Sequence, residues 1–559
     1  MILHSLDIHN YEIREASDRA GGRVYTHYFH PRNLNGNYYD VGAMRFPNIP
    51  IMSRTFDLFH RLQINQDLTP NPAQETLIPY YLNGPATPLL YNNIRAIQPD
   101  CQYPTTGWTL GTPATKIIEH RFVAQGPRAV MAPIYAYWRE VLSNPLTFEA
   151  GWAELMELDA RSVSLYYVTN WCETMTGSTG SFDGSFVSNV IHSLEFDWPA
   201  FPDNVIDDPV PADALHGDVA AEAGNVWRCV NGGSDVITRR ILPLPAIDLH
   251  LFYSDKATKI TYTPGAPTDE VMTVDFDHYG QHTSRTYTHV FNTTTLGCLQ
   301  TIDTRDAGLD YAHREAIRVL RYEHAVKLGI KFSRRWWANV QGINRGGQGK
   351  TDRPTRVVVY PSYALNTPPD QPGVLLACYN SAQDAARLGS LFDNASALSH
   401  ELVYSYVIAD LAAMHDIPEV ELRNLTESYH VYNWYGDPLT RGSWSAFGPG
   451  QYSSFYGRMQ RPQAAGHLFF SGDSTSIYPG WIVGALNSAY RTVRQFLLVE
   501  LWRAAENWEL TMYYFHLLLR LEFLWGALEY EPQPELPEDI NGFEGWNVFL
   551  GIIGAEAGL

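Results

Sequence analysis

A run of charged and small residues near the N-terminus has the composition of a nucleotide contact. Tyr11–Arg14 alternates apolar and polar positions, which predicts a short β-strand, and Glu15 follows directly. An acidic residue at the end of such a strand is where a dinucleotide-binding fold holds a ribose hydroxyl. Gly21 and Gly22 would let the backbone approach a pyrophosphate, and Arg23 adds a positive charge. Taken alone, Glu15 could also be a solvated acid at a strand end.

The glycine-rich phosphate loop that precedes such an acid in dinucleotide-binding folds is not found in this sequence. That loop, Gly-x-Gly-x-x-Gly, stands about 20 residues ahead of the acid. Here 14 residues precede Glu15, and none of them is glycine. We therefore interpret the chain as beginning partway through the first helix of a nucleotide-binding unit.

A second candidate anion site surrounds Gly472. The residues predict a short strand at Gly466–Phe470, a turn at Gly472 and a helix at Trp481–Glu500. A helix N-terminus offers free N–H groups and a partial positive charge, which favour an anionic group. An ordinary strand, turn and helix without a ligand is the other interpretation.

Arg45 could bind a carboxylate group. A planar guanidinium can hold a carboxylate with two parallel hydrogen bonds, which an ammonium cannot match. The alternative is a structural ion pair between Arg45 and Asp40, five residues earlier. Tyr379 lies in an apolar run, where a tyrosine is more often a core residue than a ligand.

Lys327 lies in the clearest strand of the sequence. Ala325–Phe332 alternates with a period of two, and this pattern places Lys327 on the face opposite Val326 and Leu328. Periodicity alone therefore predicts that Lys327 is exposed to solvent beside Lys331.

The chain as a whole is long enough for two or three domains and does not have the charge of a nucleic-acid-binding protein. It has 559 residues and a net charge of −20, which disfavours nucleic acid or an anionic membrane as a partner. The apolar stretch Leu510–Gly526 contains two basic or acidic side chains and a histidine, so we expect a packed helix and not a membrane span.

Metal and nucleotide triphosphate sites have little support in the sequence. The five cysteines contain no Cys-x-x-Cys pair, and His278 and His282 enclose Tyr-Gly, which disfavours a helix that would orient both toward one ion. Gly349-Lys350-Thr351 ends like a phosphate-binding loop, but its leading glycine is replaced by Asn344.

The motif Glu15–Arg23 resembles the signature of the flavin-dependent amine oxidase superfamily, Glu-Ala-x-x-Arg-x-Gly-Gly-Arg, at every fixed position. Asp40–Pro47 is similar to the corresponding segment of L-amino-acid oxidases of the fungal type, and the likeness extends to about residue 500. Asp473 departs from the family pattern, which usually has glutamate there.

The resemblance implies site residues in several parts of the chain. Noncovalent FAD would be bound by Glu15, Ala16, Arg19, Gly22, Arg23, Gly42, Met44, Arg45, Ile260, Gly472, Asp473, Trp481 and Ile482. The substrate would be bound by Arg45, Tyr379, Gly480, Trp481 and Trp444. The expected catalytic residues are Lys327, Arg45, Tyr379 and Trp481, with Lys327 holding a water for oxygen activation.

The resemblance also implies a mixed α/β fold with three parts. These are a discontinuous Rossmann-like FAD-binding domain (1–30, 225–310 and 446–500), a β-sheet substrate domain (31–110 and 311–445) and a helical insertion (111–224). Residues 501–559 would form a C-terminal helix and tail. Dimers are common in the family, so a homodimer is one expected assembly.

The implied function is oxidation of an L-amino acid by O2 to a 2-oxo acid, ammonia and hydrogen peroxide. Two alternatives stay open from the sequence. One is an oxidase of amines or polyamines. The other is a non-catalytic relative that binds FAD poorly because the phosphate loop is missing. The sequence leaves the compartment, cytoplasmic or secreted, undecided.

Overall fold

The computed structural model describes residues 1–29, 36–65, 74–82, 84, 86–97, 133–162, 185–196, 227–266, 269–339, 341–393 and 396–532. Most of the predicted helical insertion 111–224 lies outside these ranges, as do Cys101 and Cys172. Within the described part, residues 133–142, α4 (Pro145–Met156) and α6 (Phe186–Phe196) are helical.

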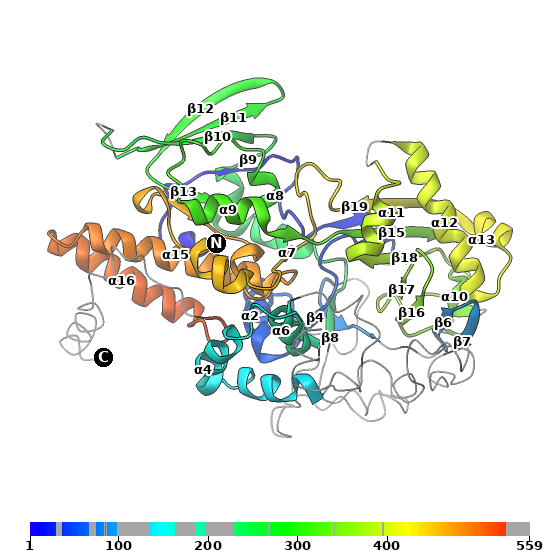
Figure 1. The fold of residues 1–559 in the computed structure, drawn as a ribbon. Coiled ribbons are helices and arrows are strands. Elements are labelled where there is room, and N and C mark those ends of the chain that lie inside the picture. Colours follow the sequence, from blue (N-terminus) through cyan, green and yellow to red (C-terminus); the bar gives the residue numbers. More distant parts are fainter. Residues whose placement is uncertain are drawn as a thin grey trace.

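A seven-stranded sheet forms one end of the molecule (Figure 1). Its strands, in spatial order, are β19 (Thr426–Asn433), β15 (Ala325–Phe332), β18 (Gly373–Ser381), β17 (Val357–Tyr360), β16 (Gly347–Thr351), β6 (Pro88–Tyr91) and β7 (Ile94–Ile97). Neighbours pair antiparallel except β16 and β6, which are parallel. The helices α10 (Trp336–Asn339), α11 (Ala382–Gly389), α12 (Ala397–His415) and α13 (Glu419–Leu425) lie beside it. Buried residues of α12 share one core with β15 and β18, and Ala325, Val374 and Leu376 of the same two strands pack in a second core, so these central strands are covered on both faces.

The other half of the molecule contains short parallel strand pairs. β1 (Ile13–Arg14) pairs with β9 (Leu251–Phe252), and β13 (Val290–Asn292) pairs with β21 (Leu468–Phe470). An antiparallel sheet of β10 (Lys256–Tyr262), β11 (Met272–His278) and β12 (Gln281–Tyr287) lies beside them. Residues Leu244–His250, which precede β9, form a 3-10 helix.

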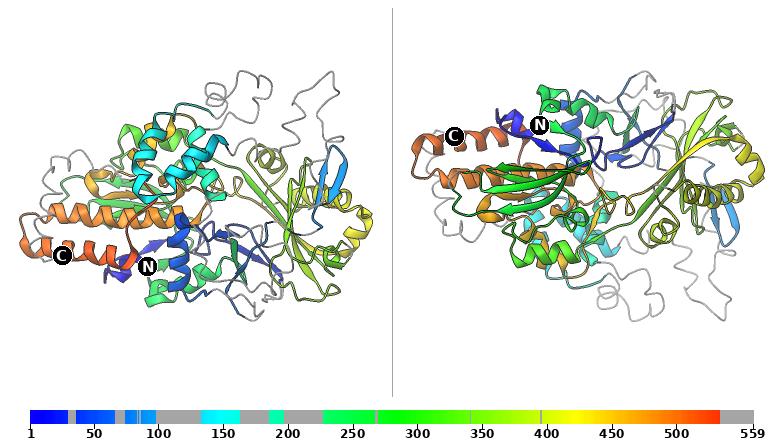
Figure 2. Two further views of the ribbon diagram at one scale, coloured as in Figure 1. Left: turned by 90° about the horizontal axis from the view of Figure 1, so that it is seen from below. Right: turned by 90° about the horizontal axis from the view of Figure 1, so that it is seen from above.

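Two long helices pack against each other at the end opposite the seven-stranded sheet, as both views of Figure 2 show. These are α15 (Ile482–Arg503) and α16 (Trp508–Trp525). The N-terminal turn α1 (Ile2–Ser5) lies against them, and Leu6 shares their apolar core with Leu497 and Leu521. No described helix is long and apolar enough to cross a membrane.

The remaining elements are shorter. The strands are β2 (Thr26–Tyr28), β3 (Tyr38–Asp40), β4 (Phe46–Pro47), β5 (Leu77–Pro79), β8 (Trp227–Val230), β14 (Arg321–Tyr322) and β20 (Ser445–Ala446). The helices are α2 (Ser53–Arg61), α7 (Val236–Ile241), α8 (Leu296–Leu299), α9 (Tyr311–Val319) and α14 (Gly457–Met459). Single turns of other helix types occur at η1 (Pro50–Met52), η4 (Tyr452–Tyr456), η5 (Ala464–Gly466) and η6 (Asp473–Thr475).

The mixed α/β fold class predicted from the sequence is confirmed. The predicted strand 325–332 coincides with β15, and the predicted helix 481–500 corresponds to α15. Gly349, Lys350 and Thr351 lie in strand β16, and His278 and His282 lie in the β11–β12 hairpin. The domain boundaries and the expected earlier start of the nucleotide-binding unit remain predictions.

Candidate active site

Lys327 is buried, with a side chain only 3% exposed, although periodicity alone predicted an exposed residue. The prediction was wrong because β15 is an interior strand of a sheet covered on both faces. Its cross-strand neighbours are Tyr379 on β18 and Tyr432 on β19. Lys331, which points to the same side, reaches the periphery and pairs with Glu427 at 2.9 Å.

The amine of Lys327 is held by the chain segment that precedes Arg45. Its Nζ donates to the main-chain oxygens of Gly42 (2.7 Å) and Asp40 (3.1 Å) and lies 3.6 Å from the sulfur of Met44. Burial lowers the pKa of Lys327 well below its usual range, and the nearby charge of Arg45 acts in the same direction. The neutral form of the amine is therefore populated at a much lower pH for Lys327 than for an exposed lysine.

Arg45 stands among aromatic rings. The centre of its guanidinium lies 5.3 Å from the ring of Phe196 and 5.5 Å from that of Trp227. The ring of Trp481 lies 5.8 Å and 6.0 Å from the same two rings. This arrangement leaves a cation in partly apolar surroundings, where an anionic ligand would be bound strongly.

The alternative ion pair between Arg45 and Asp40 is not the arrangement seen. The carboxylate of Asp40 accepts hydrogen bonds from the Thr26 hydroxyl and from both the backbone and the hydroxyl of Ser234. The charge of Arg45 instead affects the pKa of Tyr379. Burial raises the pKa of this phenol, and the positive charge of Arg45 opposes the increase.

Tyr379, Trp444 and Trp481 pack in one apolar cluster that also contains Met44. Gly480 has a φ of +85°, and a Cβ at this position would lie 3.2 Å from Trp444 Cγ. The structure thus brings together all the residues that the sequence predicted to bind substrate, although they come from β18 and from the loops before β4, β20 and α15.

Arg23 and Asp473 form a two-bonded ion pair, with N–O distances of 2.7 and 2.8 Å. Asp473 also accepts from the backbone N–H of Ser445, and Arg23 donates to the carbonyl of Ser443. The sequence predicted both residues as separate cofactor contacts and did not predict this pair, which joins the N-terminal and C-terminal motifs.

The remaining residues of the N-terminal motif leave polar groups available for a ligand. The carboxylate of Glu15 accepts a hydrogen bond from the Ser17 N–H, at 2.8 Å, and Ala16 lies between them. Arg19 stacks over Tyr25 at 4.3 Å, and its buried Nη1 has no hydrogen-bond partner among the described residues.

Three predicted cofactor contacts are engaged in packing. Only glycine fits at position 42, because a Cβ there would lie 1.8 Å from the carbonyl oxygen of Arg23. Ile260 is buried in β10 and packs in the same core as Met272. Ile482 packs against the cluster around Phe46. Their contact with a cofactor remains a prediction.

The sequence did not identify Phe196 and Trp227 as neighbours of Arg45. It also did not predict that the Asp40 carboxylate accepts several hydrogen bonds. Asp40 was recognisable only as a motif residue, and nothing local to the two aromatic residues relates them to Arg45. Among the residues that the structure describes, no group of three or more His, Cys, Asp or Glu side chains could hold a metal ion.

Comparison with known proteins agrees with the predicted family. A family profile described as flavin containing amine oxidoreductase matches residues 3–186 and 212–497. The L-amino-acid oxidase 4 of Hebeloma cylindrosporum is 31% identical in an alignment that covers 91% of this chain and 82% of that protein. A Dictyostelium discoideum relative named as a bifunctional amine oxidase is 30% identical over 89% of this chain, and the chain spans 45% of its length.

Solved structures of amine oxidases share the fold. A putrescine oxidase with bound putrescine superposes with a TM-score of 0.55 at 16% identity, covering 89% of this chain and 96% of that one. Cyclohexylamine oxidase from Brevibacterium oxydans gives a TM-score of 0.55 at 13% identity, covering 89% of this chain and 94% of that one. At these identities the likeness concerns the fold alone.

Proposed function

Because the chain belongs to the flavin-containing amine oxidoreductase family, we propose that it oxidises L-α-amino acids to 2-oxo acids, ammonia and hydrogen peroxide. The family implies a flavin, and we propose FAD held without a covalent bond. The observation that carries the substrate class is the guanidinium of Arg45, which is not paired with Asp40 and lies among Phe196, Trp227 and Tyr379.

The residues present fit such a cofactor. Within the described part of the chain the buried Nη1 of Arg19 lacks a hydrogen-bond acceptor, which an anionic pyrophosphate would supply. A Cβ at Gly22 or Gly472 would meet no atom within 4 Å, so the backbone is open on these sides. We propose that Glu15 binds the ribose of the adenosine and that Asp473 accepts from the ribityl chain. When bound, the flavin supplies the oxidant that takes two electrons from the substrate carbon and passes them to O2.

Arg45 and Tyr379 are the proposed carboxylate anchors. The guanidinium would provide two parallel N–H donors, and the phenol of Tyr379 a third donor. Burial raises the pKa of Tyr379, so its hydroxyl stays protonated and able to donate at neutral pH. Fixing the carboxylate orients the α-carbon, and such positioning accounts for a large part of enzymatic rate enhancement.

Lys327 is the proposed residue for oxygen activation. A neutral amine can donate its two hydrogens to the carbonyls of Asp40 and Gly42, as the distances permit, and its lone pair is then free to accept from a water. Trp444 and Trp481 would form apolar walls of the substrate site.

The substrate class is tested with Arg45→Met and Arg45→Lys on matched pairs of an L-amino acid and the amine lacking its carboxylate. Losing a two-bonded carboxylate contact should lower kcat/KM for the amino acid by about 100-fold or more, since a charged hydrogen bond contributes about 1.5–3 kcal/mol. Activity on the amine should hardly change. Arg387→Met, which removes an exposed arginine of α11, is the control.

Other results would support the alternatives. Equal effects of Arg45→Met on both members of a pair would reject the carboxylate role and favour an amine oxidase. A purified chain that shows no flavin absorption, even after FAD is added, would reject catalysis by this polypeptide alone.

A further inference from the structure

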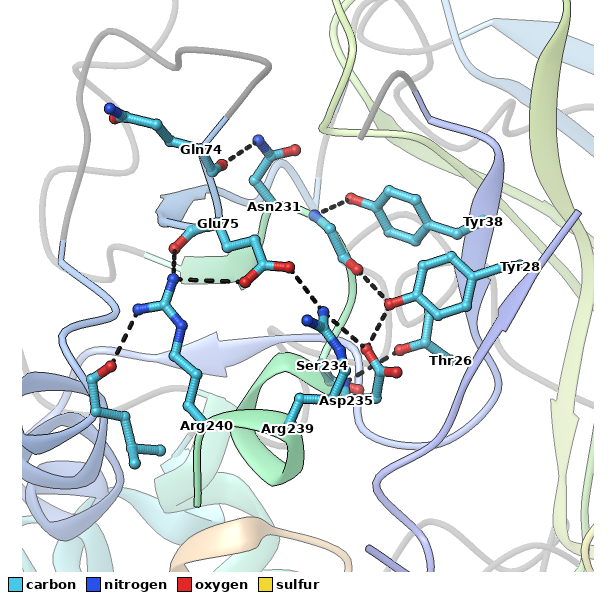
Figure 3. Close-up of polar contacts among 12 residues, drawn as sticks. Thr26, Tyr28, Tyr38, Gln74, Glu75, Asn231, Ser234, Asp235, Arg239 and Arg240 are labelled. Atoms are coloured by element: carbon cyan, nitrogen blue, oxygen red, sulfur yellow. Dashed lines mark hydrogen bonds and ion pairs between the residues drawn. The ribbon is translucent and has the colours of Figure 1, made fainter. Parts of the chain in front are cut away.

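One face of the β2–β3 hairpin is hydrogen-bonded to a turn that contains Gly232 and Gly233. Thr26 lies opposite Asp40 in this hairpin, and Tyr28 lies opposite Tyr38. The Tyr38 hydroxyl accepts from the backbone N–H of Gly232 at 2.9 Å, and the Tyr28 hydroxyl donates to the Gly232 carbonyl at 2.7 Å. Figure 3 shows both tyrosines directed at this turn, which also includes Asn231 and Ser234.

Asp40 makes the tightest connection between hairpin and turn. One oxygen of its carboxylate accepts from the Thr26 hydroxyl (2.6 Å), the Ser234 N–H (2.8 Å) and the Ser234 hydroxyl (3.0 Å). The residue is only 8% exposed. Three donors on a buried carboxylate oxygen fix the orientation of residue 40 more firmly than the strand pairing of a two-strand hairpin would.

The main chain at the same residue holds the amine of Lys327. Its Nζ lies 3.1 Å from the Asp40 carbonyl and 2.7 Å from the Gly42 carbonyl. We propose that Asp40 is a positioning residue for Lys327: its carboxylate fastens segment 40–42 to the Ser234 turn, so that two carbonyls of this segment hold the lysine amine in place. The catalytic meaning of this role rests on the proposed function.

The charge of Asp40 also acts on Lys327. A carboxylate raises the pKa of a neighbouring ammonium, whereas Arg45, the other charged group facing this amine, lowers it. The titratable groups that face Asp40 besides Lys327 have their pKa raised by burial and are uncharged at neutral pH. They are Cys229, Tyr38 and Tyr363. Burial raises the pKa of Asp40, and the charge of a protonated Lys327 acts against this increase.

The chain offers a direct measurement of this coupling, because it contains only six lysines. Protein labelled with 13C at the lysine ε-carbon should give six resonances, and Lys327→Met assigns the one of interest. In the wild type we expect this resonance to titrate well below the usual range of a lysine amine.

Asp40→Asn keeps an oxygen acceptor for Thr26 and Ser234 but removes the charge. We expect the Lys327 midpoint to fall by about one pH unit or more, the usual size of an effect from an opposite charge nearby. Asp235→Asn is the matched control: it neutralises a carboxylate on the same turn that is bonded to Tyr28 and paired with Arg239. Its Lys327 midpoint should remain that of the wild type.

Asp40→Ala tests the positioning itself. Without the acceptor, segment 40–42 should loosen, so the Lys327 resonance should broaden or move toward that of a solvated lysine, an effect that Asp40→Asn should largely avoid. A folded Asp40→Asn with an unchanged Lys327 midpoint, or an Asp40→Ala in which the Lys327 resonance is that of the wild type, would overturn the proposal. Because the readout is a lysine resonance, it decides the question even if no substrate is oxidised.

Discussion

Lys327 and Tyr379 are direct cross-strand partners, and the lysine Nζ lies 4.8 Å from the centre of the tyrosine ring. The sequence assigned these residues to two unrelated segments, one for oxygen activation and one for carboxylate binding. The antiparallel register of β15 and β18 places them side by side, and a slip by one residue would turn Tyr379 to the opposite face of the sheet. The proposed substrate and oxygen sites are therefore set by one strand pairing.

Tyr379→Phe should weaken carboxylate binding without disturbing this pairing. The ring that packs near Lys327 remains, and only the hydroxyl is lost. Removing one hydrogen bond to a charged group corresponds to about 1.5–3 kcal/mol, so KM for an L-amino acid should rise about tenfold or more. Steady-state kinetics on an amino acid and its matched amine would check this. An equal loss on both substrates would show that the hydroxyl does not act on the carboxylate.

The Arg23–Asp473 pair should stabilise the fold beyond an ordinary surface ion pair. Asp473 has a side chain 5% exposed and Arg23 one 27% exposed, so solvent screens the pair only in part. A double-mutant cycle of Arg23→Ala and Asp473→Ala should give a coupling free energy of about 1–2 kcal/mol. Asp473→Ala should be the more destabilising single change, because it also leaves the Ser445 N–H without its acceptor.

The exposed pair Glu315–Arg318 on α9 provides the control for this cycle. Its coupling should be about 0.5 kcal/mol or less. Urea unfolding of each variant supplies the free energies. A coupling for Arg23 and Asp473 no larger than that of the control pair would contradict the expectation.

Gly42→Ala should be strongly destabilising. A Cβ at this position would lie 1.8 Å from the carbonyl oxygen and 2.8 Å from the carbonyl carbon of Arg23, and backbone atoms cannot move aside cheaply. We expect a loss of about 3 kcal/mol or more in the free energy of unfolding. At Gly448 a Cβ would approach flexible side-chain atoms, none closer than 3.3 Å. Gly448→Ala should therefore be tolerated, and similar melting temperatures for the two variants would contradict this account.

The stacked imidazoles of His27 and His430 should make stability depend on pH. Their ring centres are 3.7 Å apart at an interplanar angle of 4°. Burial lowers the pKa of His27 to about 4 and that of His430 to about 3. An unfolded histidine titrates near pH 6.5, so the unfolded chain takes up protons first on acidification. The stability that the neutral pair contributes is complete above about pH 6.5 and is lost as the pH falls toward the folded values.

Unfolding free energies measured at several pH values between about 7.5 and 4.5 would check this dependence. His27→Phe preserves an aromatic ring and removes one titrating group, so the slope with pH should become smaller. His516→Gln, a change at an exposed position of α16, is the control. An unaltered slope in His27→Phe would rule out a contribution from this histidine.

The sequence by itself determined the features that are local. The motif Glu15–Arg23 predicted the family, which is confirmed, because its fixed residues lie within nine positions. The bounds of β15 were also predictable, since alternation with a period of two persists over eight residues. Arg45 was a candidate because its guanidinium chemistry is independent of its surroundings.

Only the tertiary structure decided what surrounds these residues. Whether Lys327 is buried depends on which elements pack on each face of β15. Periodicity in the sequence predicts the strand but not the elements that pack on it. Arg23 and Asp473 are 450 positions apart, and Asp40 and Ser234 are 194 apart, so no local pattern relates them. Packing of the whole chain buries these charged groups, and a buried charge needs a hydrogen-bond or ion-pair partner. The partner comes from the element that packs beside it in the folded protein, however distant that element is in the sequence.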